Sequence, residues 1–70
     1  MIIKSGTLLL FDPDALKIEY KVGMENKYYI MAYKNGKQYY VEGFSQEKAA
    51  KLKLSLITEK IKKSSEIIEI

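Results

Sequence analysis

An Asn-Gly pair at residues 35–36 most constrains the fold, because it separates two runs rich in aromatic residues. Asn-Gly favours a type I′ turn, in which both central residues need a positive φ. A two-residue loop places Lys34 opposite Lys37, and the pairing continues until Ile30 lies opposite Val41 and residue 29 opposite 42. The sequence therefore predicts an antiparallel β-hairpin over residues 28–44.

The predicted register gives this hairpin two faces of different composition. One face carries Tyr28, Ile30, Ala32, Tyr39 and Val41, and the other carries Tyr29, Met31, Tyr33, Gln38, Tyr40, Glu42 and Phe44. The first is the natural core face. The second is rich in tyrosine, which tolerates exposure when its hydroxyl is hydrated, but it also suits contact with another chain or stacking on bases. Tyr29, Tyr33 and Tyr40 are its candidate interface residues.

Residues 45–63 predict a helix with Ser45 as N-cap, an acidic residue near its start and lysines near its end. At about 100° per residue its apolar positions form two stripes. Ala49, Leu52 and Leu56 make one stripe, and Ala50, Leu54, Ile57 and Ile61 make the other. One stripe can pack on the hairpin, while the second is covered either by a partner or by the domain's own loops and tail. We select Leu52, Leu56, Ile57 and Ile61 as candidate interface anchors.

The N-terminal third of the chain allows two interpretations. Residues 2–11 contain a strand, strongest over 7–11, whose unbroken apolar run suggests burial on both faces or an edge covered by a partner. Residues 13–24 alternate like a strand, yet Asp12 as N-cap, Pro13 at the first helical position and Gly23 as C-cap favour a short helix. In the tail, Ser64-Ser65 either ends the long helix before a strand over residues 67–70, or the helix continues to the end.

Composition limits the possible functions of a single domain spanning residues 1–70. The chain lacks histidine, cysteine, arginine and tryptophan, so catalytic triads, cysteine nucleophiles and His-based metal sites are excluded. Its nine acidic residues are scattered, and we expect no enzymatic activity and no cofactor. A core this small is marginal without staples, which favours association with another subunit. The apolar segments are too short for a signal peptide or a membrane span, and we expect a cytoplasmic protein.

Three stretches resemble the Pcc family, the small dimerising subunit of the KEOPS tRNA-modification complex. They are LLFDPDALKIEYKVGM, YKNGKQYYVEGFS and KAAKLKLSLITEKIKKSSEIIEI. The chain departs from the family at Ala50-Lys51 and Ser55, where a Leu-Arg pair and an asparagine are usual, and this suggests a divergent paralogue. The resemblance implies an α+β fold: a small antiparallel sheet with a strand, a short helix, the Asn-Gly hairpin and a long C-terminal helix. The alternative fold is a four-stranded meander with a C-terminal helix.

The resemblance also implies a function, that of a non-catalytic subunit which pairs with itself or a paralogue. Such a subunit docks on the catalytic threonylcarbamoyl-transferase subunit and supports tRNA modification, with Lys48, Lys51 and Lys53 as candidates for contact with tRNA. Two other functions stay open. One is a small basic nucleic-acid-binding module that uses tyrosines and lysines, and the other is a viral or mobile-element protein that inhibits a host enzyme through an exposed strand edge.

Overall fold

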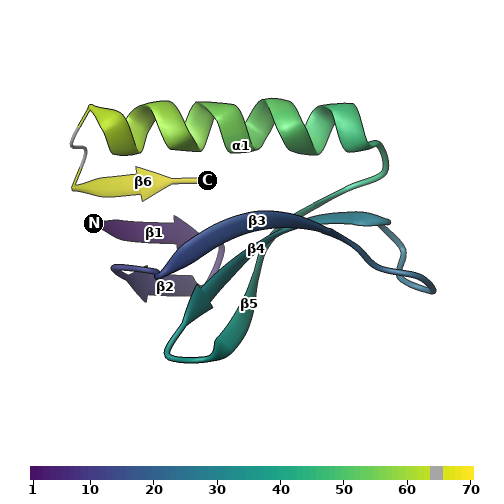
Figure 1. The fold of residues 1–70 in the computed structure, drawn as a ribbon, viewed down its shortest axis with the longest axis horizontal. Coiled ribbons are helices and arrows are strands. Elements are labelled where there is room, and N and C mark those ends of the chain that lie inside the picture. Colours follow the sequence, from purple (N-terminus) through teal and green to yellow (C-terminus); the bar gives the residue numbers. More distant parts are fainter. Residues whose placement is uncertain (64–65) are drawn as a thin grey trace.

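The computed structural model describes residues 1–63 and 66–70 and confirms the α+β class. In chain order the elements are β1 (Ile2–Ser5), β2 (Leu8–Phe11), β3 (Ala15–Tyr20), β4 (Tyr28–Lys34), β5 (Lys37–Phe44), α1 (Glu47–Lys62) and β6 (Ile67–Glu69). The strands form two three-stranded sheets, with orders β2-β1-β6 and β3-β4-β5. Figure 1 shows α1 along one side of the molecule, with both sheets beneath it.

The segment predicted to contain one strand, residues 2–11, forms the hairpin β1–β2. Ser5 lies opposite Leu8, which leaves Gly6 and Thr7 as a two-residue turn. Gly6 has a φ of 58°, and glycine at the first central position is what a type II′ turn favours. The prediction of one strand was wrong because it rested on the apolar run after residue 7. The Ser-Gly dipeptide at residues 5–6 is a turn signal, and it was not used.

Residues 15–20 are strand β3, so the short helix predicted from Asp12, Pro13 and Gly23 was wrong. The alternating interpretation of this segment was right: Leu16 and Ile18 pack against the core, and the intervening lysine and glutamate lie on the other side. Asp12 has a φ of 45°, and it lies in the corner between β2 and β3. The chain resembles the alternative meander, except that its first two strands and its last belong to a separate sheet.

The β4–β5 hairpin has the predicted register from Lys34↔Lys37 through Met31↔Tyr40. Beyond that point a β-bulge shifts the pairing by one residue, so Ile30 lies opposite Glu42 and Tyr28 opposite Phe44. The bulge moves Glu42 and Phe44 to the core side of the sheet, a correction to their predicted face. At the bulge the hydroxyl of Ser5 donates a hydrogen bond to the carbonyl of Val41, which joins the two sheets.

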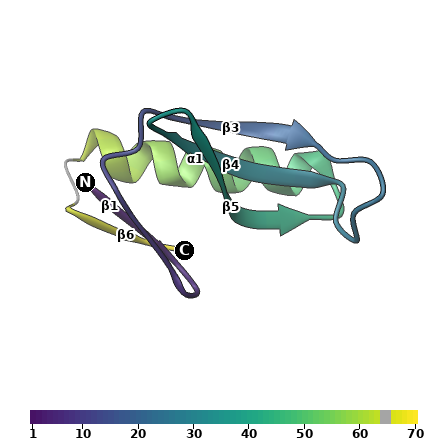
Figure 2. The ribbon, with the colours of Figure 1, turned by 90° about the horizontal axis from the view of Figure 1, so that it is seen from below.

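The core lies where α1 meets both sheets, which cross beneath the helix (Figure 2). Its fully or nearly buried side chains are Ile3, Leu10 and Ile68 from the first sheet, Ile30, Ala32 and Val41 from the second, and Ile57 from α1. The N-cap position of α1 is Gln46 rather than Ser45. β6 pairs in parallel with β1, which confirms the strand interpretation of the tail; Ser64-Ser65, the predicted helix end, lies outside the described residues.

We expect Ile57→Ala to destabilise the protein far more than Leu56→Ala. Ile57 is 2% exposed and Leu56 is 51% exposed. Truncating a buried isoleucine costs about 2–5 kcal/mol through lost burial and a residual cavity, whereas exposed positions usually change stability by about 0.5 kcal/mol or less. Urea unfolding followed by circular dichroism measures both free energies. Equal costs for the two variants would show that α1 is rotated from the orientation described.

An ion pair fastens the corner between β2 and β3 to the start of the chain. The N-terminal ammonium of Met1 lies 2.6 Å from Asp12 Oδ1, and its hydrogen bond and charge hold the pKa of the Asp12 carboxyl below its ordinary value of 3.8. On the other side of the corner, Lys34 Nζ donates to the Asp12 carbonyl oxygen at 2.9 Å, and Asn35 N–H donates to Asp14 Oδ2 at 2.9 Å. The corner is thus tied to the Asn-Gly turn.

Because the pKa of Asp12 is lower in the folded state, its ionised form stabilises the fold above pH 3.8 and this contribution disappears as the pH falls through the folded pKa. We expect carbon-detected NMR titration to give a depressed pKa for Asp12. Acetylating the N-terminal amine removes the charge and should return that pKa toward 3.8. An Asp12 pKa that is unaffected by acetylation would contradict the ion pair.

Candidate interaction surface

The outer face of α1 carries an apolar stripe that the fold leaves uncovered. Ala49, Leu52 and Leu56 follow one another at the spacing i, i+3, i+7, which aligns them along one side of a helix. Leu52 is 66% exposed and Leu56 is 51% exposed. We call these three residues the α1 outer stripe. Of the two stripes found in the sequence, the other one, with Ala50 and Ile57 fully or nearly buried, faces the sheets.

Of the four helix residues selected from sequence as interface anchors, Leu52 and Leu56 belong to the outer stripe, whereas Ile57 and Ile61 lie on the side of α1 that faces the sheets. Ile57 is a core residue and offers no area to a partner, which corrects its selection as an interface anchor. Ile61 is 37% exposed and, with Met1, Pro13 and Leu16, lines a cavity of about 270 Å³ beside the core. Leu52 and Leu56 lie together on the exposed side, as an interface requires.

Lysines border the α1 outer stripe but do not gather into one patch. Lys48 and Lys51 are exposed, and Lys51 lies 3.5 Å from Glu47 one turn earlier. Lys53 is half-buried and lies 3.8 Å from Glu42 of β5. The three lysines selected for tRNA contact thus point in different directions, because Lys53 lies near Glu42 of the second sheet, Lys51 extends toward β3, and Lys48 is turned to solvent.

The tyrosine-rich outer face of the second sheet is partly covered by its own side chains: Tyr29 and Tyr33 are half-buried, and Tyr40 is 48% exposed. The rings of Tyr29 and Tyr40 lie 5.0 Å apart between centroids, and Lys17 and Lys21 place their ammonium groups 4.9 Å and 5.8 Å from the ring centroids of Tyr33 and Tyr40. Met31, on the same face, is fully buried. These contacts occupy ring faces that a stacking platform for bases would need to offer.

Gly43 extends this packing, because it lies opposite Tyr29 and leaves room for the ring. A Cβ at position 43 would come within 2.6 Å of a Tyr29 ring carbon, closer than real contacts allow. Glycine in a strand interior often marks such a close approach. Because Gly43 has no side chain, the ring of Tyr29 can lie over it.

We expect Gly43→Ala to destabilise the protein by about 1–3 kcal/mol, since the added methyl overpacks the site and moves the Tyr29 ring. The same substitution in a Tyr29→Ala background should cost less, because the ring contacts are gone and only the Asn26 side chain, 2.8 Å from the added Cβ, has to move. A double-mutant cycle by urea unfolding measures the coupling. Additive free energies would show that the ring does not lie over Gly43.

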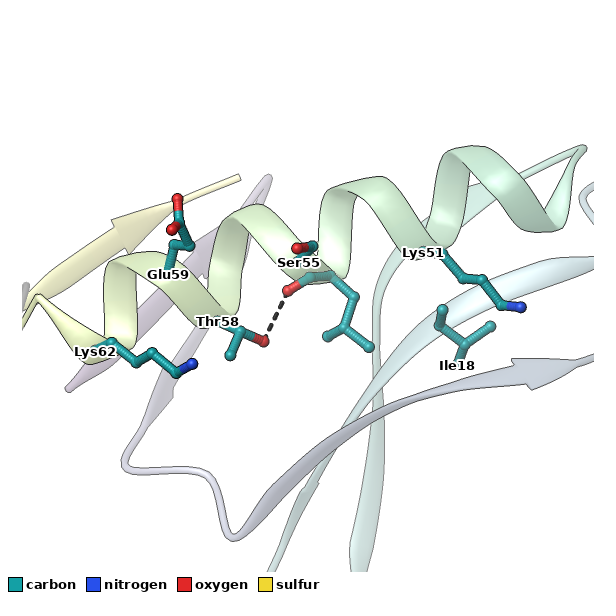
Figure 3. Close-up of a pocket in the computed structure, with 7 residues that line it drawn as sticks. Ile18, Lys51, Ser55, Thr58, Glu59 and Lys62 are labelled. Atoms are coloured by element: carbon teal, nitrogen blue, oxygen red, sulfur yellow. Dashed lines mark hydrogen bonds between the residues drawn. The ribbon is translucent and has the colours of Figure 1, made fainter.

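A groove of about 450 Å³ runs between α1 and β3, with Ile18 and Leu54 as its apolar lining. Figure 3 shows Lys51, Thr58 and Lys62 extending from the helix toward β3, while Glu59 extends away. The Thr58 hydroxyl donates to the Leu54 carbonyl at 2.9 Å, so its proton is already engaged. The groove is open and bordered by flexible lysines, and its polar groups do not converge on one point as those of a ligand site do.

The first sheet has an exposed apolar face that sequence reasoning did not single out. Leu9, Phe11 and Ile67 are 54%, 55% and 60% exposed, and Ile2 lies between the last two in the sheet. The apolar run of residues 8–11 had predicted either burial on both faces or an edge covered by a partner. The exposed residues themselves were not predicted, because the hairpin turn at Gly6 was not recognised.

Comparisons with known proteins give no relative for this chain: no protein-family model, no curated protein and no solved structure matches it. Within residues 1–63 and 66–70, no helix has the length and apolar character needed to cross a membrane. The site must therefore be judged on its own chemistry.

Proposed function

We propose that this protein is a non-catalytic binding subunit that docks on a partner protein through the α1 outer stripe. The observation that carries the proposal is the exposure of Leu52 and Leu56 at helical spacing, side by side on a helix whose opposite side is already buried. Residues at i, i+3 and i+7 are the anchors that an amphipathic helix inserts into an apolar groove.

The exposed apolar surface of the chain also supports an unfilled contact. The accessible surface is 4896 Å², whereas a compact monomer of this mass has about 4,500 Å². Isolated apolar side chains on a surface are ordinary, but contiguous ones mark interaction sites. Leu52 and Leu56 belong to this exposed surface, and their contiguous exposure, rather than the total area, supports the contact.

The positive charge of the α1 segment indicates which surface chemistry the partner should have. Residues 47–63 contain six lysines and two glutamates, which gives this segment a net charge of +4. A groove that receives α1 should therefore be apolar along its floor and acidic along its rims, since rim charges set association rate and discriminate against wrong partners. The partner we propose is a protein with such a groove.

A finer assignment, docking on a threonylcarbamoyl-transferase within a KEOPS-like complex, stays a prediction. Its support is the resemblance of the Asn-Gly hairpin and the last helix to the Pcc family. The first stretch, LLFDPDALKIEYKVGM, implied a helix where the chain has β3, which reduces that support. Binding of tRNA by Lys48 and Lys51 also stays a prediction, whereas Lys53 is held near Glu42.

The test is affinity capture with the native protein, a Leu52→Lys/Leu56→Lys variant and a matched control, Val22→Lys, whose side chain is 84% exposed in a loop. Two buried charges at a docked interface cost several kcal/mol, so we expect the stripe variant to lose at least 100-fold in affinity for the captured partner while the control binds normally. Circular dichroism checks that all three fold.

Retention of the same partner by the stripe variant, at unchanged affinity in calorimetry, would contradict docking through α1. The KEOPS assignment has a separate test. A purified threonylcarbamoyl-transferase from the same source should bind the native chain and not the stripe variant, and a lack of binding to the native chain would remove that assignment alone.

A further inference from the structure

The outer edge of β2 presents backbone groups that point away from its neighbour. In the β1–β2 hairpin, Ser5 and Leu8 flank the two-residue turn, and Asp12 N–H donates to the Met1 carbonyl at 2.7 Å. Antiparallel ladders alternate between paired residues that exchange hydrogen bonds and those that do not. Leu8, Leu10 and Asp12 therefore face β1, and the N–H and C=O groups of Leu9 and Phe11 face outward.

Among the four edges of the described sheets, that of β2 is the one without charged protection. Strand edges are normally shielded by charged side chains, bulges or covering elements. β3 carries Lys17 and Glu19 along its edge, β5 has its bulge joined to Ser5, and β6 lies against α1, follows Glu66 and ends with Glu69. β2 consists of Leu-Leu-Leu-Phe, with Leu9 and Phe11 more than half exposed.

We propose that β2 pairs with β2 of a second copy in antiparallel orientation across a two-fold axis. The register that uses every outward group places Leu9 opposite Phe11 of the other copy, and Leu10 opposite its counterpart. Each Leu9–Phe11 pair exchanges two hydrogen bonds, and the axis repeats them. The ladder ends where Thr7 meets Pro13, because proline has no N–H to donate.

This pairing creates one six-stranded sheet whose outer face has apolar residues across its centre and Lys4 and Glu69 at the far end of each row. In each copy Ile67, Ile2 and Phe11 already lie in one cross-strand row, and the proposed register continues the row with Leu9 of the second copy. The match is self-complementary, as a two-fold interface requires. The row also explains why β2 is apolar on both faces. Leu10 is 6% exposed and packs in the core, while Leu9 and Phe11 lie in the proposed contact between the two copies.

The area available sets the strength of this dimer. The contact consists of one four-residue edge strand from each copy. Such a contact is below the size of stable interfaces and within that of weak, reversible ones. We expect a dimer that forms at tens to hundreds of micromolar and dissociates on dilution.

The edge lies on the far side of the first sheet from α1, with β1 and β6 between them (Figure 1). Pairing through β2 therefore leaves both α1 outer stripes free, and the dimer offers a partner two of them. This inference goes beyond the proposed function and is independent of it, since a substitution in one surface leaves the other intact.

Light scattering over a concentration series tests the dimer with three variants. Leu9→Lys places a charge at the edge, and Leu9→Pro removes the outward N–H while a proline is tolerated on an edge strand. Both should be monomers at concentrations where the native chain is a dimer. Ile67→Lys is the matched control: it is equally exposed on the same face but two strands from the edge, and it should still form a dimer.

Amide hydrogen exchange on the native chain tests the register without any substitution. At high concentration the N–H groups of Leu9 and Phe11 should exchange at least ten-fold more slowly than at low concentration, and Lys17 should show no change. A native chain that is monomeric at several hundred micromolar, or loss of the dimer in Ile67→Lys, would overturn the proposal. Unchanged exchange at Leu9 and Phe11 in a dimer would also overturn it, since association would then use another surface.

Discussion

The fold depends on one contact, the burial of the inner side of α1 where the two sheets cross. Ile57 is almost fully buried among side chains from both sheets, and neither three-stranded sheet has a core without it. A three-stranded sheet with one covered face can be stable, whereas its strands alone are marginal. The Ser5–Val41 hydrogen bond is a second link between the sheets, but it joins only one point of each.

The same contact explains what the protein leaves exposed. A helix that covers both sheets with one side turns its other side to solvent, and the described residues form no further layer that covers it. Leu52 and Leu56 are therefore uncovered for the same reason that Ile57 is buried. The first sheet has the corresponding problem, because its core face meets α1 and its outer face, with Phe11 and Ile67, meets nothing in the described chain.

Much of this arrangement could be predicted from the sequence, where local signals agreed with the fold. The Asn-Gly turn set the hairpin register, and helical spacing gave α1 and its two stripes. The strand β3 was visible as alternation, but Asp12 and Pro13 imitate the start of a helix. Their actual role is to shape and fasten a corner through long-range contacts to Met1 and Lys34, and no local pattern encodes such contacts.

Other features could not be predicted for physical reasons. A bulge at Val41 adds one residue to a ladder without any required residue type, so the pairing beyond it was displaced by one. Two apolar stripes on one helix give no indication of which one faces the sheets, and Ile57 was consequently selected with the exposed pair. The selection of the tyrosines as interface residues stays a prediction; the contacts of Tyr29 with Tyr40 and of Lys17 with the Tyr33 ring join residues from different strands and had no local sequence signal.

One side of α1 is buried and the other, with Leu52 and Leu56, is exposed. Methyl NMR in the presence of an inert soluble paramagnetic agent measures this directly in a dilute, monomeric sample. We expect strong broadening of the Leu52 and Leu56 methyl signals and near-complete protection of Ile57 and Ile30. Protection of both leucines at monomer concentration would contradict the account, because the chain would then already cover the face that we assign to its partner.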